Sequence, residues 1–167
     1  MIRPARLEDA EAIARVHVAT WRAAYGHAVP SEMLAAVDVG ERAELWKGWL
    51  AGPSATFVGE VGDEVCGFVN VGASVDHPGE GELFSIYVLP TAWGTGLATA
   101  LIDAGEEELR TRGFTRARLN VLADNPRARR FYERQGWARG ETFQSTFLGH
   151  EVELARHRKD LSMTAGV

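Results

Sequence analysis

LFSIYVLPTAWGTGLATAL, residues Leu83 to Leu101, runs from an apolar strand through a turn with two glycines directly into a helix. At the start of a helix several backbone N–H groups lack an intrahelical partner, and the aligned peptide dipoles add partial positive charge. An anion can bind there without a lysine or arginine. Gly94 and Gly96 permit the positive φ values and close approach that such a turn needs. The stretch predicts a phosphate-binding turn, although glycines at such a connection can also serve only to turn the chain.

A second segment, NPRARRFYERQGW from Asn125 to Trp137, follows the strand-like residues 117–122. Together the two segments resemble the GNAT superfamily of acyl-CoA-dependent N-acyltransferases. The pyrophosphate loop of that family reads Q/R-x-x-G-x-G/A after a strand that ends V-x-P, and residues 88–98 match this pattern except at Trp93. Gln or Arg usually stands there, so one side-chain contact to phosphate is in doubt while the backbone contacts are kept. The family's later pattern, N-x-x-A-x-x-x-Y-x-x-x-G-[FW], is matched at Asn125, Ala128, Tyr132, Gly136 and Trp137.

Hydrophobic periodicity and turn residues divide the chain into alternating elements. Strands are expected at residues 2–4, 55–61, 65–73, 82–88, 117–121, 137–143 and 149–156, and helices at 8–24, 30–37, 40–50 and 97–112 and from 125. In the helix at 97–112, residues 98, 101, 102, 105 and 109 are expected to face inward and Glu106, Glu107 and Glu108 mostly outward. This order predicts a mixed α/β layer.

The resemblance implies the GNAT fold over a single domain of residues 1–167, with a mixed, mostly antiparallel sheet of about six or seven strands flanked by helices. The motifs that carry the resemblance lie between Glu82 and Trp137. A homodimer is left open.

Composition narrows the classes of function. The 167 residues are 46% hydrophobic and 25% charged, as in globular domains, and the formal net charge is −5. That charge argues against a general nucleic-acid binder and suits an amine substrate better. A local basic group is the exception, and it consists of Arg127, Arg129, Arg130 and Arg134. Cys66 lies in an apolar stretch and is expected to be a buried thiol. Without a signal-peptide pattern or an apolar stretch long enough to span a membrane, a cytoplasmic protein is expected.

Amide formation from an acyl thioester requires a bound cofactor, a neutral amine, a site for the oxyanion and a proton for the departing thiolate. The resemblance implies acetyl-CoA as cosubstrate, and two sets of residues would bind it. The pyrophosphate would lie on backbone amides of Gly94, Thr95, Gly96, Leu97, Ala98 and Thr99. The thioester and pantetheine amides would meet Ile86, Tyr87 and Val88, where the family's fourth and fifth strands splay apart. Asn125 would cap its helix and also bind the pantetheine arm.

Two side chains are candidates for proton transfer. An amine with a pKa near ~10 must lose a proton before it attacks. Glu82 stands where histone-modifying members of the family carry a base glutamate, and a solvated strand-end carboxylate is an equally supported interpretation. Glu80 and Asp76 are weaker substitutes, and Asn120 occupies a position where other members carry a glutamate base. Tyr132 matches the family tyrosine that returns a proton to the thiolate, the alternative being a buried aromatic residue.

The acceptor side is less well defined. Trp21, Tyr25 and His27 lie in the segment that walls the acceptor side of the family's cleft, although aromatic residues on a helix are more often core. No metal is indicated, because the five histidines lack paired ligand spacing.

The resulting hypothesis is an N-acetyltransferase that moves an acetyl group from acetyl-CoA to a primary amine of a small molecule or a protein N-terminus by direct attack. A catalytically silent acyl-CoA sensor or interaction domain is the alternative. A dinucleotide-binding protein is disfavoured, because Thr99 stands where the third glycine of that motif belongs.

Overall fold

The computed structural model describes residues 1–162, and its centre is a seven-stranded sheet in the order β1-β2-β3-β4-β5-β7-β6. The strands are β1 (Ile2–Pro4), β2 (Ala55–Val61), β3 (Glu64–Ala73), β4 (Gly81–Val88), β5 (Arg116–Leu122), β6 (Ala138–Phe147) and β7 (His150–Asp160). Neighbours are antiparallel except β4 and β5, which are parallel. The expected mixed, mostly antiparallel sheet is confirmed. Of the single domain expected over 1–167, residues 163–167 lie outside the described part.

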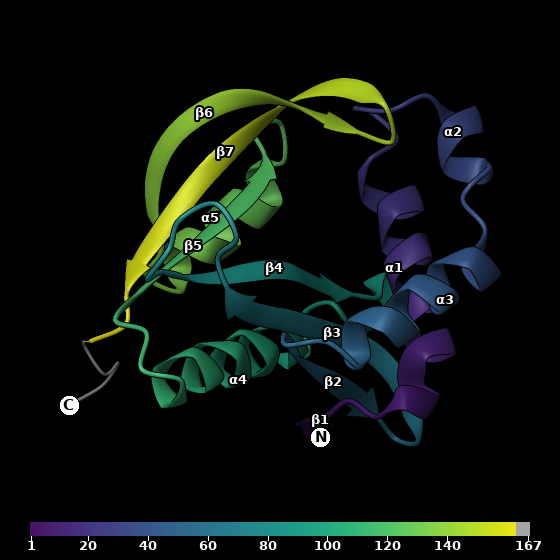
Figure 1. Cartoon of the computed structure of the whole chain (residues 1–167). Helices are drawn as coiled ribbons and strands as arrows, with labels where there is room; N and C mark the ends of the chain where they lie inside the picture. The colour runs from purple at the N-terminus through teal and green to yellow at the C-terminus, as the bar shows by residue number, and fades with distance from the viewer. Residues whose placement is uncertain (163–167) are drawn as a thin grey trace.

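Helices cover both faces of this sheet (Figure 1). They are α1 (Ala10–Ala24), α2 (Ser31–Ala35), α3 (Val39–Leu50), α4 (Leu97–Thr111) and α5 (Pro126–Arg134), with short 3-10 turns at Leu7–Asp9 and Pro90–Ala92. On one face Leu101 and Leu109 of α4 pack with Val69 of β3. On the other face Trp46 of α3 packs with Phe68 of β3 in the cluster that also contains α1. The polypeptide is therefore layered, with β3 and β4 between two apolar clusters.

β4 and β5 separate soon after they begin. The pairs Gly81↔Ala117 and Glu82↔Arg118 are the whole of their ladder in the described residues, although β4 continues to Val88 and β5 to Leu122. The Leu89 N–H donates to the carbonyl of Cys66 in β3. Because alternate residues of an antiparallel strand direct their backbone groups to opposite sides, Ile86 and Val88 direct theirs into the gap. The splay that the family resemblance implies is thus present.

A β-bulge in β4 decides which side chains share a face. The register between β3 and β4 shifts at Phe84, which is the extra residue. Residues that pair across two strands lie on the same face of the sheet. Glu82, Ser85 and Tyr87 pair with every second residue of β3, at positions 72, 70 and 68, and every second residue of a strand lies on one face. All three side chains therefore lie on the face on which α1 packs. In an unbroken strand Glu82 and Tyr87 would lie on opposite faces.

Glu106 corrects the sequence-based view of α4. Helical periodicity predicts that Glu106 faces mostly outward, but it is only 4% exposed. Its Oε1 accepts a hydrogen bond from Trp137 Nε1 at 3.0 Å, and both its oxygens accept from Lys159 Nζ at 2.9 Å. A buried carboxylate requires such partners, and here they come from residues 31 and 53 positions later in the chain. Helical periodicity alone does not contain that information.

β6 and β7 form a long hairpin that arches over the sheet toward α1 (Figure 1). Both strands extend beyond the expected limits, to Phe147 and Asp160, because cross-strand pairing continues where apolar periodicity has stopped. At the tip the Phe147 ring packs against Trp21 and Tyr25, with centroid distances of 4.9 and 5.1 Å. The hairpin therefore closes one side of the space above the gap between β4 and β5.

Candidate active site

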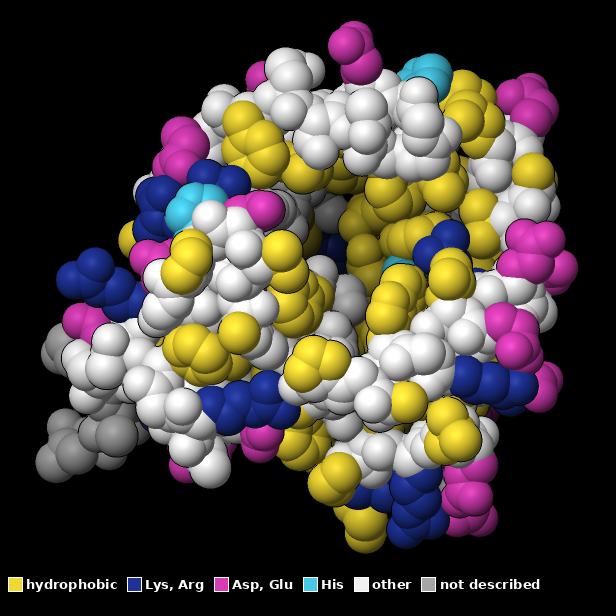
Figure 2. Space-filling model, viewed as in Figure 1, with side chains coloured by type: hydrophobic (Ala, Val, Ile, Leu, Met, Phe, Trp, Pro, Cys, Tyr) yellow, Lys and Arg dark blue, Asp and Glu magenta, His cyan; other side chains and the backbone are white. Residues whose placement is uncertain are grey.

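A hollow opens in the face of the molecule shown in Figure 2, between β4, α1 and the arch of β6 and β7 in Figure 1, and hydrophobic side chains gather along one of its walls. The aromatic residues that connect α1, β4 and the hairpin tip lie in this region, and they are Trp21, Tyr25, Tyr87 and Phe147. The gap between β4 and β5 therefore lies next to an apolar wall.

The glycine turn has the backbone that the sequence predicts. Gly94 and Gly96 have φ values of +76° and +86°, and no atom lies within 4 Å of a Cβ built on either. Gly96 is the N-cap of α4, and the Thr95 hydroxyl holds the turn by donating to the carbonyl of Ala92 at 2.6 Å. Within residues 1–162 the first-turn N–H of Ala98 has no acceptor. The turn can therefore receive an anion on backbone groups.

Trp93, the departure from the family pattern, lies between this turn and the strand gap. Its indole Nε1 donates to the carbonyl of Val88 at 3.0 Å. The guanidinium of Arg127, from the first turn of α5, lies 3.5 Å from the centre of the Trp93 ring. The Asn125 side chain just before α5 accepts from the N–H of Ala128 at 3.2 Å, so the predicted cap is confirmed.

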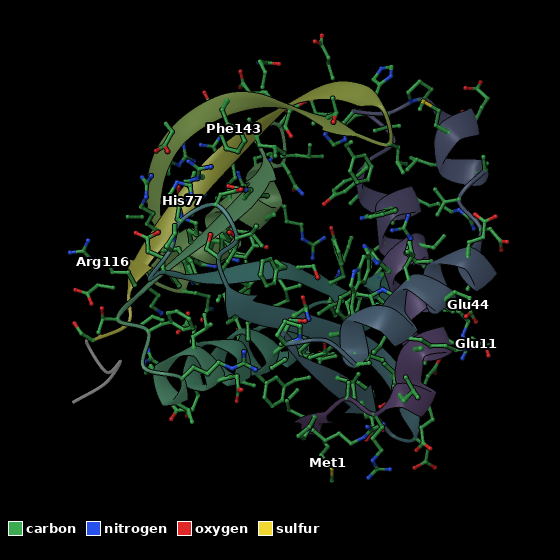
Figure 3. The ribbon with its side chains drawn as sticks, viewed as in Figure 1. Met1, Glu11, Glu44, His77, Arg116 and Phe143 are labelled. Carbon is green, nitrogen blue, oxygen red and sulfur yellow. The ribbon has the colours of Figure 1, made fainter. Side chains whose placement is uncertain are left out.

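Glu82 lies half-buried at the start of β4, and its carboxylate is only partly engaged. The Ser74 hydroxyl donates to Oε1 at 2.9 Å, and in the described residues its other oxygen has no partner. Arg118 pairs with Glu82 in the parallel ladder between β4 and β5. The Arg118 guanidinium nevertheless donates to Glu80 at 2.8 Å and contacts His77, instead of binding Glu82. Figure 3 shows His77 on the loop between β3 and β4. Because Glu80 forms an ion pair with this buried arginine, Glu80 is a weaker candidate for the substitute base.

Tyr132 lies in α5 and is 8% exposed. Burial is the main cause that raises the pKa of Tyr132 well above its usual value, and the phenol of Tyr87 raises it further. Among residues 1–162 its hydroxyl has no hydrogen-bond partner. A phenol whose pKa is raised stays protonated at neutral pH, so this group can donate a proton but does not act as a base.

The hydroxyl of Tyr87 is the centre of a polar contact that sequence reasoning missed. Trp21 Nε1 donates to it at 3.1 Å, and the Tyr25 hydroxyl lies 3.1 Å away. Burial is the main cause that raises the pKa of Tyr87 and of Tyr25. The sequence predicted only backbone contacts for Tyr87, because the bulge that turns its side chain toward α1 has no local signature.

His17 is buried behind this wall and is uncharged. Its Nδ1 accepts from Trp46 Nε1 at 3.1 Å, and an indole can only donate, so the imidazole proton must be on Nε2. Burial, with a smaller effect of Arg42, lowers the pKa of His17 to about 3. A group with that pKa is a poor acceptor of protons from an ammonium ion. His17 therefore belongs to the wall and not to the proton-transfer groups.

Arg42 of α3 continues the wall toward α2. Its guanidinium carbon lies 4.7 Å from the centre of the Trp21 ring, and burial lowers its pKa. In the part of the chain that the structure describes, its buried Nε has no acceptor. A pocket of about 380 Å³ opens beside it, lined by residues of α2, α3 and the segment between them together with Leu148.

His27 makes different contacts from Trp21 and Tyr25, the other two candidate substrate residues. Its Nε2 lies 2.7 Å from the backbone carbonyl of Asp124, so it ties the segment after α1 to the turn before α5. Its side chain is exposed, whereas Trp21 is 7% exposed and lies within the wall. Cys66 is buried as expected. Over residues 1–162 there is no group of three or more His, Cys, Asp or Glu side chains placed to hold a metal ion, and no helix long and apolar enough to cross a membrane.

Solved structures share this fold. An N-acetyltransferase from Staphylococcus aureus Mu50 superposes with a TM-score of 0.76 at 22% identity, over 96% of this chain and 98% of that one. PaiA N-acetyltransferase from Thermoplasma acidophilum, solved in complex with coenzyme A, gives 0.77 at 17% identity, over 96% and 98%. YncA from Salmonella typhimurium, a putative acetyltransferase solved with acetyl-CoA, gives 0.75 at 21% identity, over 100% and 96%. The fold is therefore that of the GNAT-type N-acetyltransferases.

Comparison of the amino-acid sequence with those of known proteins assigns the chain to a family. The pattern of the Acetyltransferase (GNAT) family matches residues 12–137. The uncharacterized N-acetyltransferase YuaI of Bacillus subtilis (strain 168) is 34% identical over 130 residues, which are 75% of this chain and 73% of YuaI. Mycothiol acetyltransferase of Streptomyces griseus is 34% identical over 134 residues, but this chain spans only 39% of its length. The chain belongs to the Acetyltransferase (GNAT) family, and it is an acetyl-CoA-dependent acyltransferase. The resemblance drawn from the two motifs is confirmed.

Proposed function

We propose that this protein transfers an acetyl group from acetyl-CoA to a primary amine of a small molecule or a protein N-terminus by direct attack on the thioester. The observation that carries the proposal is the open gap between β4 and β5, which has the glycine turn of α4 after the end of β4 and α5, the helix of Tyr132, after the end of β5. The CoA and acetyl-CoA complexes of PaiA and YncA, which share the fold, support it.

The backbone would hold the cofactor. The pyrophosphate would lie on the amides from Gly94 through Thr99, and the pantetheine arm would pair with the free edge of β4. Since the carbonyl of Val88 already accepts from Trp93, the groups left for the arm and the thioester oxygen are the Val88 N–H and both groups of Ile86. Asn125, whose side chain already caps α5, would meet the arm from the β5 side.

Proton transfers would then follow the two polar side chains. Glu82, acting through a water molecule, would take the proton that makes the acceptor amine neutral. The amine nitrogen would bond to the thioester carbon, the carbon–sulfur bond would break, and Tyr132 would protonate the departing sulfur. The second proton that the attacking nitrogen loses as the amide forms would return the Tyr132 oxygen to its phenol form. The aromatic wall of Trp21 and Tyr25 would contact the acceptor, and the pocket beside Arg42 would leave room for the rest of it.

Acetyl-CoA is expected to bind with one-to-one stoichiometry and to raise the melting temperature, since a ligand that binds only the folded state stabilises it by mass action. At a ligand concentration of about 100 times Kd the gain is about 2.7 kcal/mol, or roughly 5–11 °C for a domain of this size. Differential scanning fluorimetry measures it, with NADH as the matched control that should produce no shift. No shift with millimolar CoA or acetyl-CoA would remove the proposal. Binding without thiol release across a panel of amines would favour the silent sensor.

Glu82→Gln is expected to lower turnover most at acidic pH, where more of the acceptor is protonated and a base is most needed. We expect a loss of about 10²-fold there, with little change in the affinity for acetyl-CoA. The measurement is a pH–rate profile of thiol release. Asp63→Asn is the control, because Asp63 is an exposed carboxylate in the turn between β2 and β3 and is not a candidate base. An unchanged profile for Glu82→Gln would transfer the role to Glu80, Asp76 or a chain of water molecules.

A further inference from the structure

Arg127 lies at the mouth of the gap between β4 and β5. It belongs to the first turn of α5, which follows the end of β5, whereas Trp93 and Gly94 follow the end of β4. Because β4 and β5 are parallel, these two segments lie at the same edge of the sheet. The stacking of the Arg127 guanidinium on Trp93 at 3.5 Å therefore spans the gap beside the glycine turn.

The Trp93 ring is a fixed support for this guanidinium. Its Nε1 donates a hydrogen bond to the Val88 carbonyl, and two residues further on the Thr95 hydroxyl donates to the carbonyl of Ala92. Trp93 is 43% exposed, so its ring is accessible to a cation at the surface. A cation over an indole face is attracted by the ring quadrupole, so the charge is held at the turn.

The other members of the basic group do not share this position. Arg129 donates to the backbone carbonyl of Ala123 at 3.0 Å and is half-buried. Arg130 and Arg134 are exposed on α5. Within residues 1–162 the Arg127 guanidinium pairs with no carboxylate, so its donors are free for a ligand.

We propose that Arg127, positioned by Trp93, is a phosphate-binding residue for CoA and replaces from α5 the side-chain contact that Gln or Arg of the family pattern makes from position 93. This inference rests on the proposed function, since it assumes that the pyrophosphate lies on the glycine turn. A planar guanidinium with several N–H donors matches phosphate oxygens, and the contact would be charge-assisted. The α4 and α5 sides of the gap would then both bind the anion, one through backbone amides and the other through Arg127.

Isothermal titration calorimetry of acetyl-CoA with the full chain tests this. Arg127→Ala is expected to weaken binding about 5- to 20-fold, as for a charge-assisted contact at a partly exposed site. Arg130→Ala, on the same helix, should stay within about twofold of wild type. Arg127→Lys should recover part of the loss, and raising the salt concentration should weaken binding less in Arg127→Ala than in wild type. The melting temperature of the unliganded variant should fall by at most about 4 °C, because Arg127 is exposed and the folded protein loses only its stacking on Trp93.

Titration with 3′-dephospho-CoA identifies the phosphate. An equal loss with both ligands assigns Arg127 to the pyrophosphate and supports the inference. A loss with CoA alone assigns it to the 3′-phosphate and overturns the proposed replacement of the contact from position 93. Trp93→Ala should reproduce most of the effect, Trp93→Phe should retain binding, and the double variant with Arg127→Ala should be no weaker than the single one.

Unchanged affinity in Arg127→Ala overturns the inference while the proposed function stands. Tighter acetyl-CoA binding in Arg127→Ala also overturns the inference, because it would mean that the stacked Arg127 and Trp93 side chains obstruct the gap. If wild-type protein does not bind acetyl-CoA, the proposed function fails and this inference fails with it.

Discussion

Gly96→Val is expected to abolish acetyl-CoA binding in a protein that still folds. Gly96 has a φ of +86°, which a β-branched residue adopts only with strain, and a Cβ there would project into open space at the N-terminus of α4. Nothing in the protein clashes with it, so the fold should survive a backbone cost of about 1–3 kcal/mol. The new side chain would occupy the space through which a pyrophosphate approaches the backbone amides.

Gly113→Val is the matched control for that variant. Gly113 has a φ of +91° with no atom within 4 Å of its Cβ position, but it follows the opposite end of α4. Both variants should lose similar stability in chemical denaturation, and only Gly96→Val should lose binding in calorimetry. A folded Gly96→Val protein with wild-type affinity would place the phosphate site elsewhere.

Tyr132→Phe is expected to lower turnover by about 10²–10⁴-fold, the usual range for a lost general acid, with little change in acetyl-CoA affinity. The ring packing is retained, and within residues 1–162 the hydroxyl has no partner to lose. Because burial raises its pKa, the phenol remains protonated through neutral pH and beyond, so the loss should appear across the whole working range. Turnover should not vanish, since a thiol with a pKa near ~8.5 leaves tolerably as a thiolate.

The leaving group distinguishes an acid from a structural residue. With an acyl donor whose thiol is more acidic, the deficit of Tyr132→Phe should shrink, because that thiolate needs less protonation. Tyr25→Phe makes the same change at the hydroxyl that contacts Tyr87, and any loss there should not depend on the leaving thiol. Equal deficits with both donors would show that Tyr132 only positions other groups, and wild-type turnover would place the acid elsewhere.

Features encoded by neighbouring residues were predictable from the sequence. The glycine turn with its positive φ values, the Asn125 cap and the alternation of strands and helices each depend on residues within a few positions of one another. The two motifs also sufficed for the family and fold, because each combines residue types whose spacing follows from local backbone geometry. The same residues then supplied the candidates for the cofactor site.

Features made by residues far apart were decided by the tertiary structure. The bulge at Phe84 brings Glu82 and Tyr87 to one face, and no local pattern announces it. The periodicity of α4 placed Glu106 outward, since its partners Trp137 and Lys159 arrive only through the topology of β6 and β7. At position 93 the sequence likewise shows only that the usual Gln or Arg is absent. Folding brings Arg127, 34 residues later in the chain, onto the Trp93 ring. The two residues meet because β4 and β5 are parallel and end at the same edge of the sheet. Local propensity governs turns and caps, but register and strand order determine which distant side chains meet.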